Sequence, residues 1–164
     1  TFGTLAGGQS REIYLECLVA PEVQGDLTEI ATVRAEFDDL QRGTNAKMKA
    51  SPVVVGYTED KILAEKSVNQ AIVAEAVIYA NAVETERTIA LADLGDLVAT
   101  RANIVKQQGS LSEALASAPE AQRQMLKEEL AELDETMQDL ESESLSKEQR
   151  KKLSIGSFLK RNAK

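Results

Sequence analysis

Apolar residues recur at helical spacing along much of the chain, beginning just after Gly25. Asp26 and Glu29 form a pattern typical of a helix N-terminus, in which side chains satisfy free backbone N–H groups. The apolar positions that follow are three or four residues apart and would share one helical face: Leu27, Ile30, Val33, Phe37 and Leu40. We therefore predict a helix from about residue 26 that fades between Gly43 and Ser51, before Pro52.

A second and much longer helix is predicted over about residues 58–108. No proline interrupts this stretch, and such a helix would be roughly 75 Å long. Its apolar stripe is broad, and Gly95 is its one internal weak point: Ile72, Ala76, Tyr79, Val83, Ala90, Leu94, Leu97 and Ile104. A helix of this length cannot bury so wide a face within a compact chain of 164 residues, so we expect other subunits to cover the surplus.

A third helix is predicted to begin near Ala118, because Ser117 and Glu120 have the spacing of a capping box. Its helix-packing positions alternate in steps of four and three, the period of a coiled-coil seam: Leu126, Leu130, Leu133, Met137 and Leu140. Two readings stay open for this segment. It forms a short coiled coil over residues 120–143, or it packs along the long helix as an antiparallel hairpin.

Together these patterns predict an all-α protein, an elongated helical bundle or hairpin built around one long central helix at about 58–108. Residues 1–25 form an irregular N-terminal arm, 26–146 the helical body and 147–164 a basic C-terminal tail. Within the arm, residues 12–20 fit either a short strand or a helical turn, and Cys17 is expected to be packed among their apolar side chains.

Charge is distributed unevenly. The chain has 19 Lys and Arg against 27 Asp and Glu, a net charge of −8, yet the last 18 residues hold seven basic residues and one acid. An acidic body disfavours nucleic acid, so that class of ligand is open only to the tail. The tail either folds back on the acidic body or binds a partner through its basic and apolar residues: Lys151, Lys152, Leu153, Ile155, Phe158, Leu159, Lys160 and Arg161. A protein partner is favoured over a membrane surface, and nucleic acid comes third, because only Phe158 could stack on a base.

Several kinds of chemistry are excluded by composition. The chain has no histidine and one cysteine, which removes histidine-based catalysis and histidine or multi-cysteine metal sites. Residues 3–10 match the glycine spacing of a phosphate-binding loop, but Gln9 stands where the lysine belongs. Glu75 lies alone in the least charged part of the long helix and either faces solvent, joins helices or, rarely, marks a site. We expect no enzyme activity, cofactor or metal.

No stretch is predicted to cross a membrane, and the visible start lacks the pattern of a signal peptide. We therefore expect a cytoplasmic or virion-internal location, without secretion or integral insertion. The layout, an acidic helical body with a short basic tail, is broadly similar to scaffolding and internal virion proteins of tailed phages and to secretion-system adaptors. This similarity assigns no residue a role. It implies a non-enzymatic structural or assembly component that forms homo-oligomers and binds other protein subunits; the alternative is an adaptor or chaperone-like protein that docks a partner through its tail.

Overall fold

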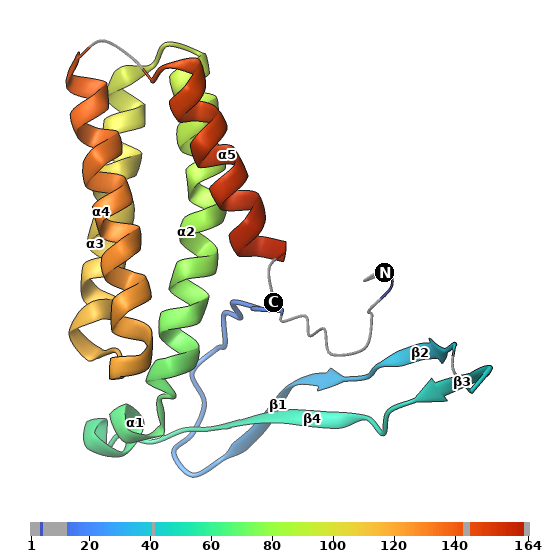
Figure 1. Cartoon of the computed structure of the whole chain (residues 1–164). Coiled ribbons are helices and arrows are strands. Elements are labelled where there is room, and N and C mark those ends of the chain that lie inside the picture. The colour runs from blue at the N-terminus through green and yellow to red at the C-terminus, as the bar shows by residue number, and fades with distance from the viewer. Residues whose placement is uncertain (1–3, 5–12, 41, 143–144, 163–164) are drawn as a thin grey trace. The chain divides into compact units, whose positions relative to one another are not determined.

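The computed structural model describes residue 4 and residues 13–40, 42–142 and 145–162 (Figure 1). These residues are about 61% helical, but they also form two small antiparallel sheets, so the all-α prediction is wrong. The chain divides into two compact units: Glu16–Val68, and Asn69–Lys164 together with Thr1–Leu15. Strands are confined to the first of these units and the four longest helices to the second.

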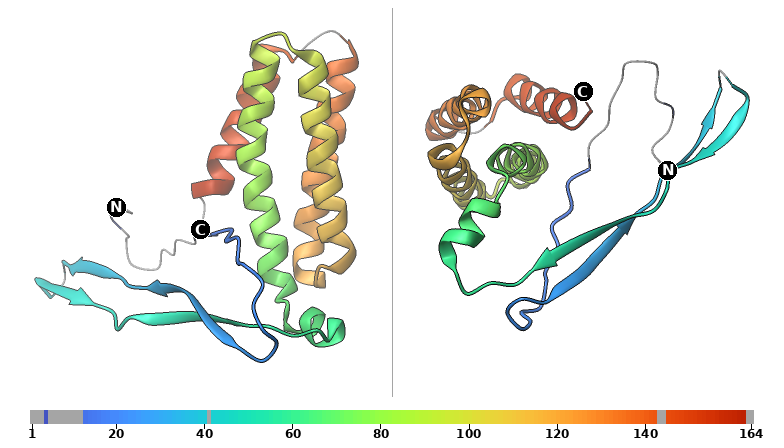
Figure 2. Two further views of the ribbon diagram at one scale, coloured as in Figure 1. Left: turned by 180° about the vertical axis from the view of Figure 1, so that it is seen from behind. Right: turned by 90° about the horizontal axis from the view of Figure 1, so that it is seen from below.

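The helical unit is a four-helix bundle. Its helices are α2 (Gln70–Asp93), α3 (Leu97–Ser117), α4 (Glu120–Ser142) and α5 (Lys147–Asn162). Short connections make consecutive helices run in opposite directions, and α2 packs against both α3 and α5 while α3 packs against α4 (Figure 2). The bundle therefore closes on itself within one chain.

The predicted single helix over 58–108 is wrong, because two local signals divide it. Asn69 caps α2 by accepting from the backbone N–H groups of Ala71 and Ile72, and a separate helix, α1 (Lys61–Ser67), precedes it. Gly95 has a φ of +75°, a left-handed conformation that ends α2, and Asp96 then caps α3. Gly109, predicted as the end of the long helix, lies inside α3.

The predicted helix near 118 is confirmed as α4, and its apolar seam faces the interior of the bundle. Leu126, Leu133 and Leu140 are buried, and Leu130 and Met137 are partly buried against them. The same core includes Ile104 and Leu111 from α3 and Ile78 from α2. Of the apolar stripe predicted for the long helix, Ile104 is buried, whereas Ile72, Val83 and Leu94 are 45–81% exposed, so the bundle covers that stripe only in part.

The other unit replaces the predicted helix after Gly25 with strands. They are β1 (Leu27–Val33), β2 (Glu36–Asp39), β3 (Thr44–Lys47) and β4 (Ser51–Gly56). β1 pairs with β4 and β2 with β3, both antiparallel, so residues 27–56 form one long two-stranded hairpin, here termed the β-ribbon. Its base is closed where Gly25 N–H donates to Tyr57 O over 3.0 Å.

Local chemistry explains the β-ribbon and its turn. β-Branched residues dominate β1 and β4, and such side chains favour extended backbone. At the far end, Gly43 adopts a φ of +62° and the Asp39 carboxylate accepts from the Arg42 N–H over 3.1 Å. Residues 13–20 form neither helix nor strand, and Cys17 is exposed, not packed as expected.

Candidate functional site

The predicted tail forms helix α5 over Lys147–Asn162. Ser146 and Gln149 form a reciprocal capping box at its start: the Gln149 N–H donates to Ser146 Oγ over 3.2 Å and the Ser146 N–H donates to Gln149 Oε1 over 2.6 Å. The helix continues through Gly156 to Asn162. Gly156 is half-buried, and a side chain there would meet Glu132 of α4.

The basic residues of α5 are largely engaged by acids of the same bundle. Four of them bind carboxylates on α2 or α4: Lys152 binds Glu135, Lys160 binds Glu129 and Glu132, Arg150 binds Asp93 and Arg161 binds Glu86. Of the two readings of the tail, these contacts favour the one in which it folds back on the acidic body. Charge from these four side chains is already neutralised within the chain.

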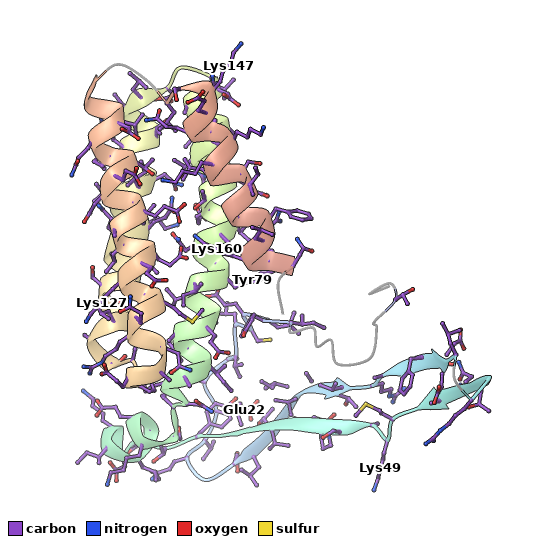
Figure 3. The ribbon with its side chains drawn as sticks, in the orientation of Figure 1. Glu22, Lys49, Tyr79, Lys127, Lys147 and Lys160 are labelled. Carbon is purple, nitrogen blue, oxygen red and sulfur yellow. The ribbon has the colours of Figure 1, made fainter. Side chains whose placement is uncertain are left out.

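Lys160 is the most deeply placed of these residues and lies on the bundle side of α5 (Figure 3). Its ammonium is 2.8 Å from Glu129 Oε1 and 2.6 Å from Glu132 Oε2, and Glu129 also accepts from Asn81 Nδ2 over 2.7 Å. Burial lowers the pKa of Lys160, but the hydrogen bonds and negative charges of the two glutamates outweigh it, so the pKa is raised. The network joins α2, α4 and α5.

The outward side of α5 differs from the side that faces the bundle. Leu153 is buried in the core, whereas Ile155, Phe158, Leu159 and Lys151 are exposed. The predicted partner-binding residues therefore separate into two groups. Lys152, Leu153, Lys160 and Arg161 hold α5 to the bundle, and the exposed four remain available on its surface.

The bundle interior contains polar side chains in a hydrogen-bonded arrangement. Thr88 Oγ1 accepts from Asn103 Nδ2 over 3.0 Å and from Gln107 Nε2 over 2.7 Å. Both oxygens of the buried Glu129 have partners within the bundle, Oε2 accepting from Asn81 and Oε1 binding Lys160. Across the described residues, no cluster of three or more metal-ligating side chains occurs.

An acidic groove of about 390 Å³ lies between α4 and α5. Its charged lining consists of Lys152, which is bound to Glu135, and further carboxylates of both helices: Glu132, Asp139 and Glu148. The hydrogen bond and charge of Glu135 raise the pKa of Lys152. Negative charge in the groove disfavours anionic ligands such as phosphates.

Glu75 joins segments that are distant in sequence. Its Oε2 accepts from the Tyr14 hydroxyl over 3.0 Å, and its Oε1 accepts from Gln122 Nε2 of α4 over 3.4 Å. The Tyr14 ring also contacts that of Tyr79, with centroids 5.6 Å apart. The half-buried Glu75 thus favours the joining role among those considered for it. Of residues 3–10, which resemble a phosphate-binding loop, only Thr4 is among those described.

The β-ribbon has one face without charged side chains between its base and its turn. Cross-strand partners lie on the same face, and successive pairs alternate between the two faces. One face carries small and apolar pairs: Thr28 with Val55, Ala31 with Val53, Val33 with Ser51, Ala35 with Met48, and Phe37 with Ala46. We call this set of ten residues the apolar face.

The opposite face of the β-ribbon, here called the polar face, carries charged side chains of the paired strands, together with the apolar Leu27, Pro52 and Val54. Its pairs include an ion pair between Glu36 and Lys47 at 3.2 Å and a hydrogen bond from Asn45 Nδ2 to Asp38 at 3.0 Å. Thr32 donates to Glu29 on this face as well. The β-ribbon is therefore amphipathic, with one face suited to water and the other to burial.

No described residue of the unit 16–68 is buried, so nothing within that unit covers the apolar face. Four of its five large side chains are 40–63% exposed: Val33, Phe37, Met48 and Val53. The fifth, Val55, is half-buried. Sequence reasoning missed this surface because it assigned residues 27–40 to a helix. The signal that could have revealed it is the density of β-branched residues in 28–33 and 53–55.

Among the residues that the structure describes, no helix is long and apolar enough to cross a membrane. This agrees with the expectation that the chain is not an integral membrane protein through such a helix. No protein-family model matches the sequence, and no curated protein or solved structure is significantly similar to it.

Proposed function

We propose that this chain is a non-enzymatic assembly component of a multi-subunit complex and that the β-ribbon is its contact element. The observation that carries the proposal is the uncharged apolar face, which the unit 16–68 leaves exposed. Self-association was first expected from surplus helical surface. The helices instead turn back into a bundle that leaves part of this surface exposed, and the proposal rests on the strands.

The stability of two-stranded hairpins supports a contact role. Such a hairpin is marginally stable in water by itself, and a lasting one needs further strands or a layer packed against its hydrophobic face. Within the part of the chain that the structure describes, no third strand pairs with the β-ribbon of residues 27–56. An exposed apolar surface of this kind is typical of a protein-binding element.

The polar groups of the bundle also support a structural role. Each oxygen of the buried carboxylate Glu129 has a partner, one Asn81 and the other Lys160, and Lys160 has both of its partners on α4. These groups hold α2, α4 and α5 together. The sequence contains no histidine to act as a general base.

A second candidate is an adaptor that docks a partner through the outward side of α5. The specific observation is that Ile155, Phe158 and Leu159 are exposed on one helix beside the basic residue Lys151. We rank this candidate below the first, because four of the six basic residues of α5 bind acids of the same chain and would steer a partner only weakly.

Excision of the β-ribbon tests the proposed function. Gly25 and Tyr57 are hydrogen-bonded to each other, so a variant lacking residues 26–56 can be joined there without stretching the chain. We expect the full chain in an extract of its native cell to migrate as a stoichiometric complex cross-linked through the β-ribbon, and the excised variant to migrate as the free chain with its helical circular dichroism retained. Unchanged complex formation by the excised variant, or loss of the complex only with Phe158→Asp, would reject the β-ribbon as the contact element.

A further inference from the structure

We infer that the partner of the apolar face is the same face on a second copy of this chain. This inference rests on the proposed function, and names the partner that the β-ribbon takes. The two β-ribbons would pack face to face as two layers related by a two-fold axis, with each polar face left in solvent.

The first argument concerns the strand edges, which are the alternative contact route for a hairpin. β4 contains Pro52, which has no N–H to donate, and β1 contains a bulge between Glu29 and Ala31. Prolines and bulges are the devices by which proteins prevent an edge strand from pairing with another chain. With the edges protected, the uncharged face is the surface left for association.

The second argument concerns area. Four of the five large side chains of the apolar face are 40–63% exposed. With its smaller residues, the face offers on the order of 500 Å² per copy, so that two copies would bury on the order of 1,000 Å², which is the size at which a specific interface begins. The amount suits a complete but small two-fold interface.

The third argument concerns charge. The protein has a net charge of −8, so two copies repel each other over most of their surfaces. From the Thr28–Val55 pair to the Phe37–Ala46 pair, the apolar face contains no charged residue, so two such faces meet without like-charge contact. It also offers no ionic group that would select a partner of opposite charge. The face is therefore complementary to itself.

A matched pair of variants of the full chain tests the inference. Val33→Lys with Phe37→Lys places two charges on the apolar face, and Thr32→Lys with Asn45→Lys places the same two on the polar face, beside Glu29 and Asp38. We expect wild type and the polar-face variant to dimerise in analytical ultracentrifugation. The apolar-face variant should raise the dissociation constant by roughly 100-fold or more, since each change occurs twice at a two-fold interface.

Salt separates an apolar interface from an ionic one. The wild-type dimer should persist or tighten when NaCl is raised, because screening reduces the repulsion between the acidic chains. A chain that stays monomeric in isolation at millimolar concentration would overturn the inference. Equal weakening of the dimer by both double variants would overturn it as well.

Cross-linking gives a readout that does not depend on charged variants folding. In a Cys17→Ser background, Phe37→Cys should be joined between copies by a short bismaleimide, whereas Asp38→Cys on the opposite face should not; equal yields would contradict the inference. If the isolated chain is monomeric but a different protein protects the β-ribbon in the native complex, this inference fails and the proposed function stands. If the β-ribbon is unprotected in the isolated chain and in the native complex, this inference and the proposed function both fail.

Discussion

Replacing Lys160 by methionine should destabilise the helical bundle far more than the same change at Lys152. The two lysines lie on α5, and both bind carboxylates of α4. Methionine keeps the apolar stem of each side chain and removes only the ammonium. The comparison therefore measures how much charge pairing contributes to stability at a partly buried and at an exposed position of α5.

The expected magnitude follows from the burial of the partners. Glu129 is 6% exposed, so Lys160→Met leaves an almost fully buried carboxylate without its cation. Breaking a buried pair on one side costs about 3–5 kcal/mol. Lys160 and Glu132 are each more than a quarter exposed, and Asn81 still donates to Glu129. We therefore expect Lys160→Met to lower the free energy of unfolding by about 2–3 kcal/mol. The Lys152 pair is well exposed on both sides, and its loss should leave the free energy of unfolding nearly unchanged.

Urea unfolding followed by circular dichroism at 222 nm measures both variants, with equal slopes required for the comparison. Adding Glu129→Gln to Lys160→Met provides a check, because the neutral amide no longer needs the cation and can still accept from Asn81. We expect this second change to restore at least half of the lost stability. Equal losses for the two lysine variants, or no recovery with Glu129→Gln, would refute the reasoning.

Three further predictions concern the same bundle. The raised pKa of Lys160 means that its contribution to stability is complete below pH 10.5 and lost as the pH rises through the pKa of the folded state; the difference in unfolding free energy between wild type and Lys160→Met should therefore shrink as the pH is raised above 10.5. Gly95→Ala should destabilise by about 1–2 kcal/mol because of its positive φ, whereas Gly109→Ala inside α3 should stabilise by up to about 1 kcal/mol; thermal unfolding distinguishes the two signs. Tyr14→Phe should cost about 1 kcal/mol by removing the hydroxyl bond to Glu75, and urea unfolding should show that loss, which an unchanged midpoint would contradict.

Helix α4 could be predicted because its information is local. Leu126, Leu133 and Leu140 repeat at seven-residue intervals, and the residues between them are mostly polar. Which surface receives this seam is not local information. A coiled-coil partner and a neighbouring helix of the same chain present similar apolar ridges, so the sequence pattern left both readings open.

The division of the long predicted helix depends on two small polar signals. Asn69 and Asp96 are each good N-caps, but caps also occur inside helices as ordinary polar residues. Gly95 costs only about 1 kcal/mol within a helix, too little to decide the matter locally. Tertiary packing determines where the helix ends, because a chain that turns back at Gly95 packs α2 against α3 and buries Ile78 and Ile104 in the core.

The polar network around Glu129 was outside the reach of pattern reasoning for a different reason. Asn81, Glu129 and Lys160 lie on three different helices, and Asn81 and Glu129 are 48 residues apart in the sequence. No residue near any one of them in the sequence indicates the other two. The charge asymmetry between the tail and the acidic helices did indicate that folding back was one alternative. Pairing of particular residues requires the packing of α5 between α2 and α4.

The β-ribbon shows how one inserted residue can imitate a helix. A regular strand repeats its apolar positions every two residues, but the bulge between Glu29 and Ala31 adds a residue and shifts the alternation by one. Ile30, Val33 and Phe37 then stand three and four residues apart, which is the spacing of a helical face. Asp26 and Glu29 completed the imitation by matching a capping box. The feature that hid the strand from the sequence pattern is therefore one of those that protect its edge, and recognition of this surface required the register of the paired strands.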